Sequence, residues 1–91
     1  MPDPCLAIPP TLPGLERARK IIAEHERLAR DNAYLARRIL HVAASDPRVE
    51  DTAKMMRLAR LLDTTAWYHA RKARALATEL AAASAALASS P

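Results

Sequence analysis

Apolar side chains recur at helical spacing over two long stretches of this chain. In the first stretch a central line repeats every seven residues, with one further line on either side of it. The central line is Ile21, Leu28, Leu35 and Val42; its neighbours are Ile22, Ala29, Ala36 and Ala43, and Ala18, His25, Asn32 and Ile39. A stripe of this width is typical of a helix with one packed face. The pattern therefore predicts a helix over about residues 15–44.

A short polar break precedes the second stretch. Asp46 can cap a helix start, Pro47 suits a first helical position, and Glu50 and Asp51 favour the positive end of the helix dipole. The chain then contains neither glycine nor proline until Pro91. The apolar stripe consists of Met55, Ala59, Leu62, Ala66, His69, Ala73, Leu76, Leu80 and Leu87. We therefore expect a second helix over about residues 47–88.

Two long helices joined by a tight corner form an antiparallel helical hairpin. The predicted fold is therefore all-α, with the hairpin spanning residues 14–91. Counting outward from the corner pairs Leu35 with Met55, Leu28 with Leu62, and Ile21 with His69. The segment 79–90 then extends beyond the first helix, where its alanines would allow close approach by another segment or chain.

The N-terminal stretch, residues 1–13, contains five of the seven prolines. Proline fixes φ and lacks a backbone donor, so we expect an extended arm here rather than a helix. Leu6, Ile8 and Leu12 could lie against a neighbouring surface, or the arm could be a frayed end.

The predicted second helix has more apolar surface than one seam can bury. Its additional line consists of Leu58, Leu61, Thr65 and Tyr68, and Leu40 points away from the stripe of the first helix. Because two-sided helices normally have two neighbours, these residues predict an oligomer contact, most simply a four-helix bundle of two hairpins. A different protein could instead cover the same line. A buried Asn32 could fix the register of that assembly, or it could hydrogen-bond locally.

Charge is concentrated in one part of the chain. The 91 residues carry a net charge of +4, and Lys54 to Arg74 alone carries +5. Each predicted helix has a basic line with one aromatic residue in it: Lys54, Arg57, Arg60, Trp67, Arg71 and Arg74 on the second, and Lys20, Arg27, Arg30, Tyr34, Arg37 and His41 on the first. Such lines suit an acidic protein surface or a nucleic-acid backbone, although solvated helix faces are also rich in arginine.

Several kinds of chemistry lack their usual signatures. The three histidines and the lone Cys5 follow no metal-ligand spacing, and the single glycine excludes phosphate-cradling loops. We therefore expect no catalytic residue, no cofactor and no metal. No apolar run approaches the ~20 residues of a membrane span, and the single cysteine fits a reducing compartment. These features favour a cytoplasmic location without membrane contact.

Taken together, the residues favour a small non-catalytic adaptor or inhibitor that docks on a partner through a basic and aromatic helix face. The first alternative is a nucleic-acid-binding subunit of weak specificity that uses both basic lines. The second is a purely structural assembly component whose arginines only solvate it.

Overall fold

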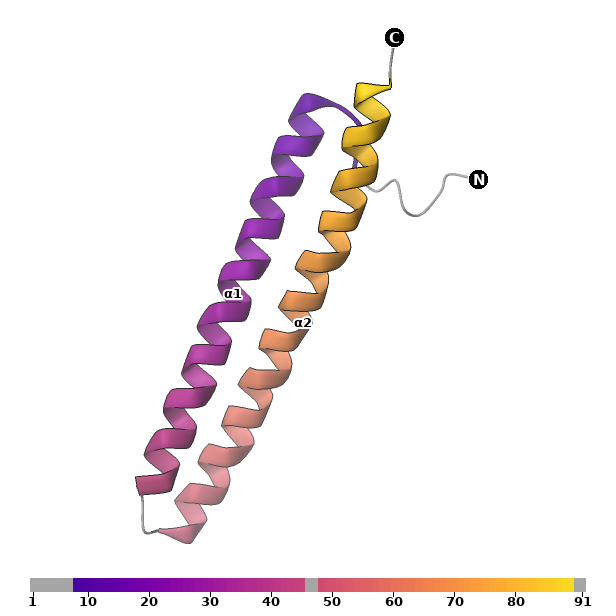
Figure 1. Ribbon diagram of the computed structural model, residues 1–91. Coiled ribbons are helices and arrows are strands. Elements are labelled where there is room, and N and C mark those ends of the chain that lie inside the picture. Colours follow the sequence, from indigo (N-terminus) through magenta and orange to yellow (C-terminus); the bar gives the residue numbers. More distant parts are fainter. Residues whose placement is uncertain (1–7, 46–47, 90–91) are drawn as a thin grey trace.

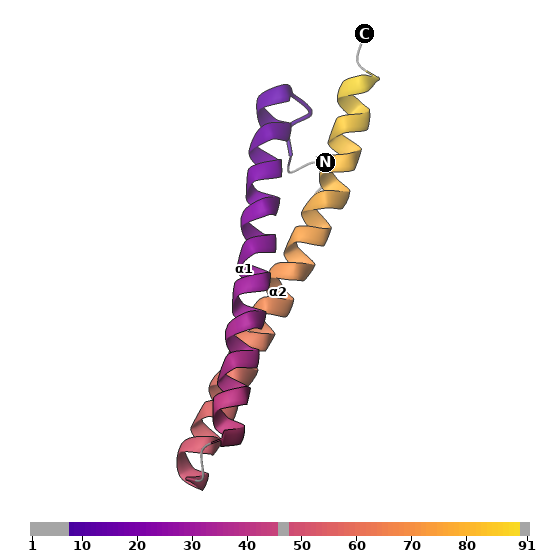
Figure 2. The same ribbon diagram turned by 60° about the vertical axis from the view of Figure 1, so that its left-hand side comes forward.

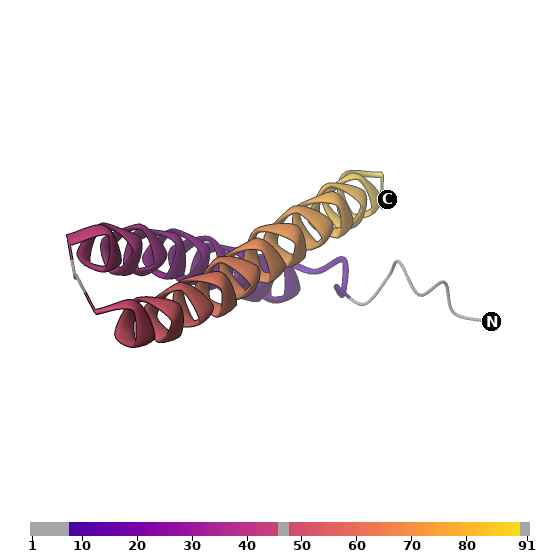
Figure 3. The ribbon, with the colours of Figure 1, turned by 90° about the horizontal axis from the view of Figure 1, so that it is seen from below.

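The chain folds into a pair of antiparallel helices. The computed structural model describes residues 8–45 and 48–89, and these contain two helices, α1 (Leu12–Ser45) and α2 (Val49–Ala88), and no strand. The helices run side by side along their length and cross at a shallow angle (Figures 1, 2 and 3). The all-α helical hairpin predicted from the sequence is therefore confirmed.

α1 begins earlier than predicted, because its start signal lies inside the proline-rich arm. The hydroxyl of Thr11 accepts a hydrogen bond from the amide of Gly14 at 3.1 Å, and the Thr11 carbonyl accepts one from Leu15 at 2.9 Å. Thr11 is thus the N-cap, and Pro13 lies in the first turn, where its missing N–H costs nothing. Residues 12 and 13 consequently belong to the helix and not to the arm.

The described end of the arm folds back onto the hairpin. Ile8 is buried with Leu15, Ala18 and Ala83, and leucines of α2 surround this cluster. Gly14 permits the contact, since a Cβ there would lie 2.5 Å from the carbonyl oxygen of Pro9. The expectation that arm residues lie on a neighbouring surface holds for Ile8. It is wrong for Leu12, which is 73% exposed, and Leu6 lies outside the described residues.

The start of α2 also differs from the prediction. α2 begins at Val49 with Arg48 at the N-cap position, and the side chain of Arg48 makes no capping hydrogen bond. Glu50 and Asp51 do lie in its first turn. The Asp51 carboxylate forms an ion pair with Arg48 Nε at 3.1 Å. The expected roles of Asp46 and Pro47 concern positions outside the described residues.

The seam between the helices consists largely of alanine. Most buried positions of each helix follow a seven-residue spacing. On α1 these are Leu15, Ile22, Ala36 and Ala43, with Ala18 in addition; on α2 they are Ala59, Ala66 and Ala73, with Ala83 in addition. The stripe predicted for α2 is therefore the seam. On α1 the predicted central line is wrong, because Ile21, Leu35 and Val42 remain 42–50% exposed. Small side chains let the two backbones approach closely. The alanine line of α1 therefore faces α2, and the larger side chains lie along the edges of the seam.

The pairing register differs from the prediction by about one helical turn. His69 lies opposite His25 rather than Ile21, and Ala36 lies near Ala59. The later end of α1, at Ser45, and the later start of α2, at Val49, account for this shift, because they move the midpoint of the hairpin toward the C-terminus. The predicted overhang of α2 is correspondingly shorter, and the arm reaches it: Ala83 is 1% exposed and packs against Ile8.

The hairpin is a single layer one helix thick. Its principal extents are 67 × 24 × 13 Å, and the shortest is close to the ~10–12 Å diameter of one helix. Away from Ile8 and the cluster that it covers, each seam residue is therefore covered only by the opposite helix. Both broad faces of the layer are open, which explains why large apolar side chains remain exposed.

The alanine seam predicts an asymmetric response to enlargement. Ala36→Leu should destabilise the protein by about 2 kcal/mol, because the added atoms must separate two closely packed backbones. Ala23→Leu, at an exposed position of the same helix, should change stability by less than about 0.5 kcal/mol. Urea unfolding followed by circular dichroism measures both changes. Equal effects would show that the seam does not run through Ala36.

Candidate docking site

The two broad faces of the hairpin carry different side chains. Ala33 of α1 and Ala70 of α2 line one shallow hollow together with Asp63. A second hollow, next along the same face, joins Leu40 to Met56. Because each hollow is lined by residues of both helices, one edge of α1 and one edge of α2 lie on a common face of the hairpin. Each helix has residues on the far side of the seam from these hollows. Because the two helices are paired, those residues lie together on the second broad face of the hairpin.

The first of these faces is rich in arginine and is called the arginine face below. Arg30 and Trp67 line the first hollow, and Arg37 and Arg60 line the second. Arg74 lies seven residues after Trp67, two helical turns further along the same side of α2. All five side chains are exposed. None of the four arginines has a carboxylate partner among the described residues, so their charges are available to a partner.

Trp67 is the aromatic centre of the arginine face. Its side chain is 64% exposed, and the guanidinium of Arg71 lies 4.8 Å from the ring centroid. That distance is within the range of a cation–π interaction, which holds the ring and the cation in a defined arrangement. A third hollow, lined by Trp67, Tyr68 and Arg71, continues from here across the back of α2. Trp67 therefore borders two hollows.

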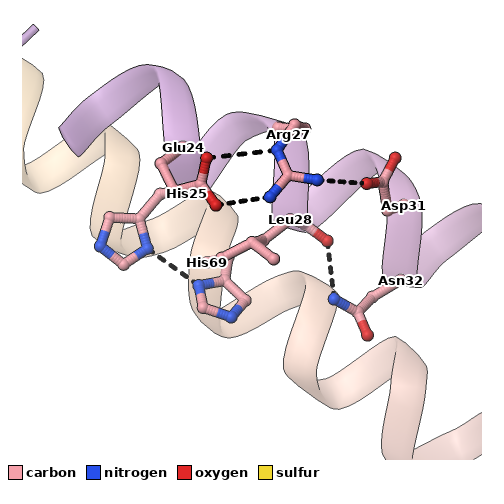
Figure 4. A network of polar contacts seen from close by, with 7 residues as sticks. All are labelled: Glu24, His25, Arg27, Leu28, Asp31, Asn32 and His69. Carbon is pink, nitrogen blue, oxygen red and sulfur yellow. Dashed lines mark hydrogen bonds and ion pairs between the residues drawn. The ribbon is translucent and has the colours of Figure 1, made fainter. Parts of the chain in front are cut away.

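The basic line predicted for α1 is only partly available. Arg27 bridges two carboxylates of its own helix, Glu24 and Asp31, the latter at 3.1 Å (Figure 4). The hydrogen bond from Arg27 lowers the pKa of Glu24 and raises the pKa of Arg27 itself. Lys20 likewise lies 3.8 Å from Glu16. These internal pairs leave Arg30 and Arg37 as the unpaired arginines of that line.

Three other predicted docking residues lie away from the arginine face. Tyr34 lies on the back of α1, where it shares a hollow with Arg37 and its hydroxyl accepts a hydrogen bond from Arg38 at 3.2 Å. This bond raises the pKa of Arg38. On α2, helical spacing places Arg57 on the outer side and Lys54 toward the opposite face. The predicted set therefore does not form one surface.

The opposite face is the apolar flank, which consists of Ile21, Leu28, Leu35 and Val42 of α1 with Leu58, Leu61, Thr65 and Tyr68 of α2. Four of the five residues predicted for an oligomer contact belong to it. Leu40 does not, because it lies with Met56 on the arginine face. The sequence pattern predicted that the α1 members lie in the packed face, because they recur at the seven-residue spacing of a packed stripe.

Polar side chains interrupt the seam at two levels. His25 and His69 meet across it with their Nδ1 atoms 2.8 Å apart, one donating and the other accepting (Figure 4). Asn32 donates to the Leu28 carbonyl of its own helix at 2.7 Å. The interpretation that Asn32 hydrogen-bonds within its own helix is therefore confirmed. The histidine pair was not foreseen, because its members are 44 residues apart and only the register brings them together.

The described residues hold no group of three or more His, Cys, Asp or Glu side chains that could bind a metal ion. The histidine pair thus has no third ligand near it in this part of the chain. Within the same residues, neither helix combines the length and apolar character that crossing a bilayer requires.

Comparison with known proteins finds no match for this chain among protein-family models, curated proteins or solved structures.

The histidine pair predicts a coupled response to substitution. Replacing either His25 or His69 with leucine leaves the other half-buried imidazole without its partner, so each single change should destabilise the hairpin. The double change removes both polar groups, and its cost should fall below the sum of the single costs by about 1 kcal/mol. Urea unfolding of the four proteins gives this coupling. Additive effects would show that the imidazoles do not interact.

The Glu24–Arg27 pair predicts a measurable change in ionisation. Because the folded chain holds the pKa of Glu24 below its ordinary value, the pair's contribution to stability is present above the ordinary carboxyl range and is lost as the pH falls through the lowered pKa. In Arg27→Gln, the pKa of Glu24 should rise toward its ordinary value. An NMR titration of the Glu24 side chain tests this, and an unchanged pKa would contradict the pairing.

Proposed function

We propose that this protein is a non-catalytic docking module that binds an acidic surface of another protein through the arginine face. The observation that carries the proposal is the arrangement around Trp67. An exposed tryptophan lies under one arginine of its own helix and shares a hollow with Arg30 of the other helix. Tryptophan and arginine are the residues most enriched among the energetic anchors of protein interfaces.

The charge pattern supports a partner that presents carboxylates. Arg30, Arg37, Arg60 and Arg74 project from both helices without internal partners among the described residues. Guanidinium groups pair with carboxylates through two parallel hydrogen bonds, which gives orientation as well as energy. The shallow alanine-lined hollows between these arginines give apolar side chains of the partner a place to pack.

Asp63 favours a protein partner over a nucleic-acid backbone. Its exposed carboxylate lines both hollows of the arginine face and has no ion-pair partner among the described residues. A phosphate chain that crosses the face would meet this negative charge midway. A protein surface can place a lysine, an arginine or a hydrogen-bond donor opposite it, so a mixed charge pattern fits this face better than a uniformly negative one.

The proposed function is non-catalytic because shallow hollows on a layer one helix thick do not form an enclosed site. General acid–base and nucleophilic chemistry depend on preorganised groups in a site that excludes water. The titratable groups of the arginine face lie at exposed positions instead, where water competes for every interaction. Binding by surface complementarity does not need an enclosed site.

The test compares matched variants in quantitative affinity capture from the native cell, followed by titration of the captured protein. Trp67→Ala and Arg30→Gln should each weaken binding by roughly 30-fold, because central aromatic and arginine anchors each contribute about 2 kcal/mol or more. Arg27→Gln removes an arginine that is already paired, and Tyr34→Ala removes an exposed aromatic from the back of α1. Both controls should bind like the wild type. In the variants that retain Trp67, the fluorescence of this sole tryptophan of the chain gives a second measure of binding.

Two outcomes would contradict the proposal. Equal losses in Arg30→Gln and Arg27→Gln would mean that general charge, and not the arginine face, governs binding. Tight binding to a short oligonucleotide, with a log–log salt slope of several units, would favour the nucleic-acid alternative, since each neutralised phosphate adds ~0.7–0.9 to that slope.

A further inference from the structure

The apolar flank is an uncovered hydrophobic surface that extends over both helices. Six of its eight residues are 42–66% exposed: Ile21, Leu35, Val42, Leu58, Leu61 and Tyr68. The described part of the arm reaches only the open end of this flank, where Ile8 and Ile21 line a common hollow. Leu35 and Leu58, toward the corner, receive no such cover.

The uncovered area is close to what a stable interface needs. At the ~150–200 Å² that side chains of this size expose when nothing covers them, the exposed fractions of these six residues leave roughly 450–600 Å² on each chain. That area lies toward the upper end of the ~300–600 Å² that the largest apolar patch of a typical monomer covers, and such patches are often functional surfaces. With a polar rim added, this flank approaches the ~800 Å² that each partner buries in an interface of standard size.

The distribution of charge identifies a second copy as the occupant. Along the outer edge of the flank both helices carry both signs: Arg17, Glu24, Asp31 and Arg38 on α1, and Asp51, Lys54, Lys72 and Glu79 on α2. Two copies can therefore meet there without net repulsion. Two arginine faces, in contrast, would bring unpaired arginines against each other, which is unfavourable. A layer one helix thick also gains most by stacking on an identical layer, since two hairpins together form a four-helix bundle.

We propose that two copies of this chain associate through their apolar flanks into a four-helix bundle. The apolar flank of each hairpin then faces the bundle interior, and the arginine faces point outward on its two opposite sides. Each assembly therefore carries two docking surfaces. The association depends only on the apolar flank and stands whether or not the arginine face binds a partner.

The chain offers controls of matched exposure on the other face. Leu35 and Leu58 of the apolar flank are 47% and 48% exposed, and Leu40 and Met56 of the arginine face are 46% and 48% exposed. The test variant is Leu35→Glu with Leu58→Glu, and the control is Leu40→Glu with Met56→Glu. Sedimentation equilibrium at micromolar concentration should give a dimer for the wild type and the control. In the test variant the dissociation constant should rise by more than ~100-fold, because carboxylates would be buried without partners.

Crosslinking gives a second measurement that does not depend on a variant that might unfold. With Cys5 replaced by serine, Leu61→Cys places a thiol on the apolar flank and Leu40→Cys places one on the arginine face. Mild oxidation should link two copies through Leu61→Cys much faster than through Leu40→Cys. A wild-type monomer at ~100 µM, well above the dissociation constants of stable dimers, would overturn the proposal. So would equal rates of crosslinking, or a dimer that persists in the folded Leu35→Glu, Leu58→Glu variant.

Discussion

The close approach of α1 and α2 through alanine is the constraint on which the rest of this structure depends. Ala36, Ala59 and Ala66 are each 2–6% exposed, and their small side chains allow the two backbones to pack tightly. The same choice limits how much apolar area the seam can bury, since a methyl group contributes far less than a leucine side chain. Much of the larger apolar surface consequently lies beside the seam. Most helical stability in proteins comes from burying such surface, so the hairpin has an energetic reason to be covered.

The seam also determines which residues share a face. Once the alanine line faces α2, Ile21, Leu35 and Val42 must turn to one edge of α1, and Ala33 and Leu40 must turn to the other. The same rotation brings Arg30 beside Trp67 and Arg37 beside Arg60. Two basic lines that look equivalent in the sequence thus separate into one arginine face and several outlying cations. Local pairing divides them further, because Arg27 is neutralised by Glu24 and Asp31 while Arg30 is not.

Periodicity was sufficient to predict the two helices, their antiparallel arrangement and the full seam of α2. It could not predict the rotation of α1, because Ile21, Leu28 and Leu35 repeat with the same seven-residue period as the alanines beside them, and hydrophobicity alone favours the larger residues. The register error came from the corner, because α1 ends at Ser45 and α2 begins at Val49, both later than the periodicity predicted. The Thr11 cap was visible in principle, as a hydroxyl residue two positions before a proline, but the surrounding prolines indicated an extended arm. Contacts between residues distant in sequence, such as His25 with His69, follow only from the correct register.

The most direct test of this account is an NMR measurement of which methyl groups meet across the seam. In a sample labelled at alanine, leucine and methionine methyls, the account predicts strong nuclear Overhauser effects between Ala36 and Ala59 and between Ala29 and Ala66. Strong effects from Leu35 to Met55 and from Leu28 to Leu62, without the alanine pairs, would contradict it. That result would place the large side chains inside the seam and remove the basis for an apolar flank.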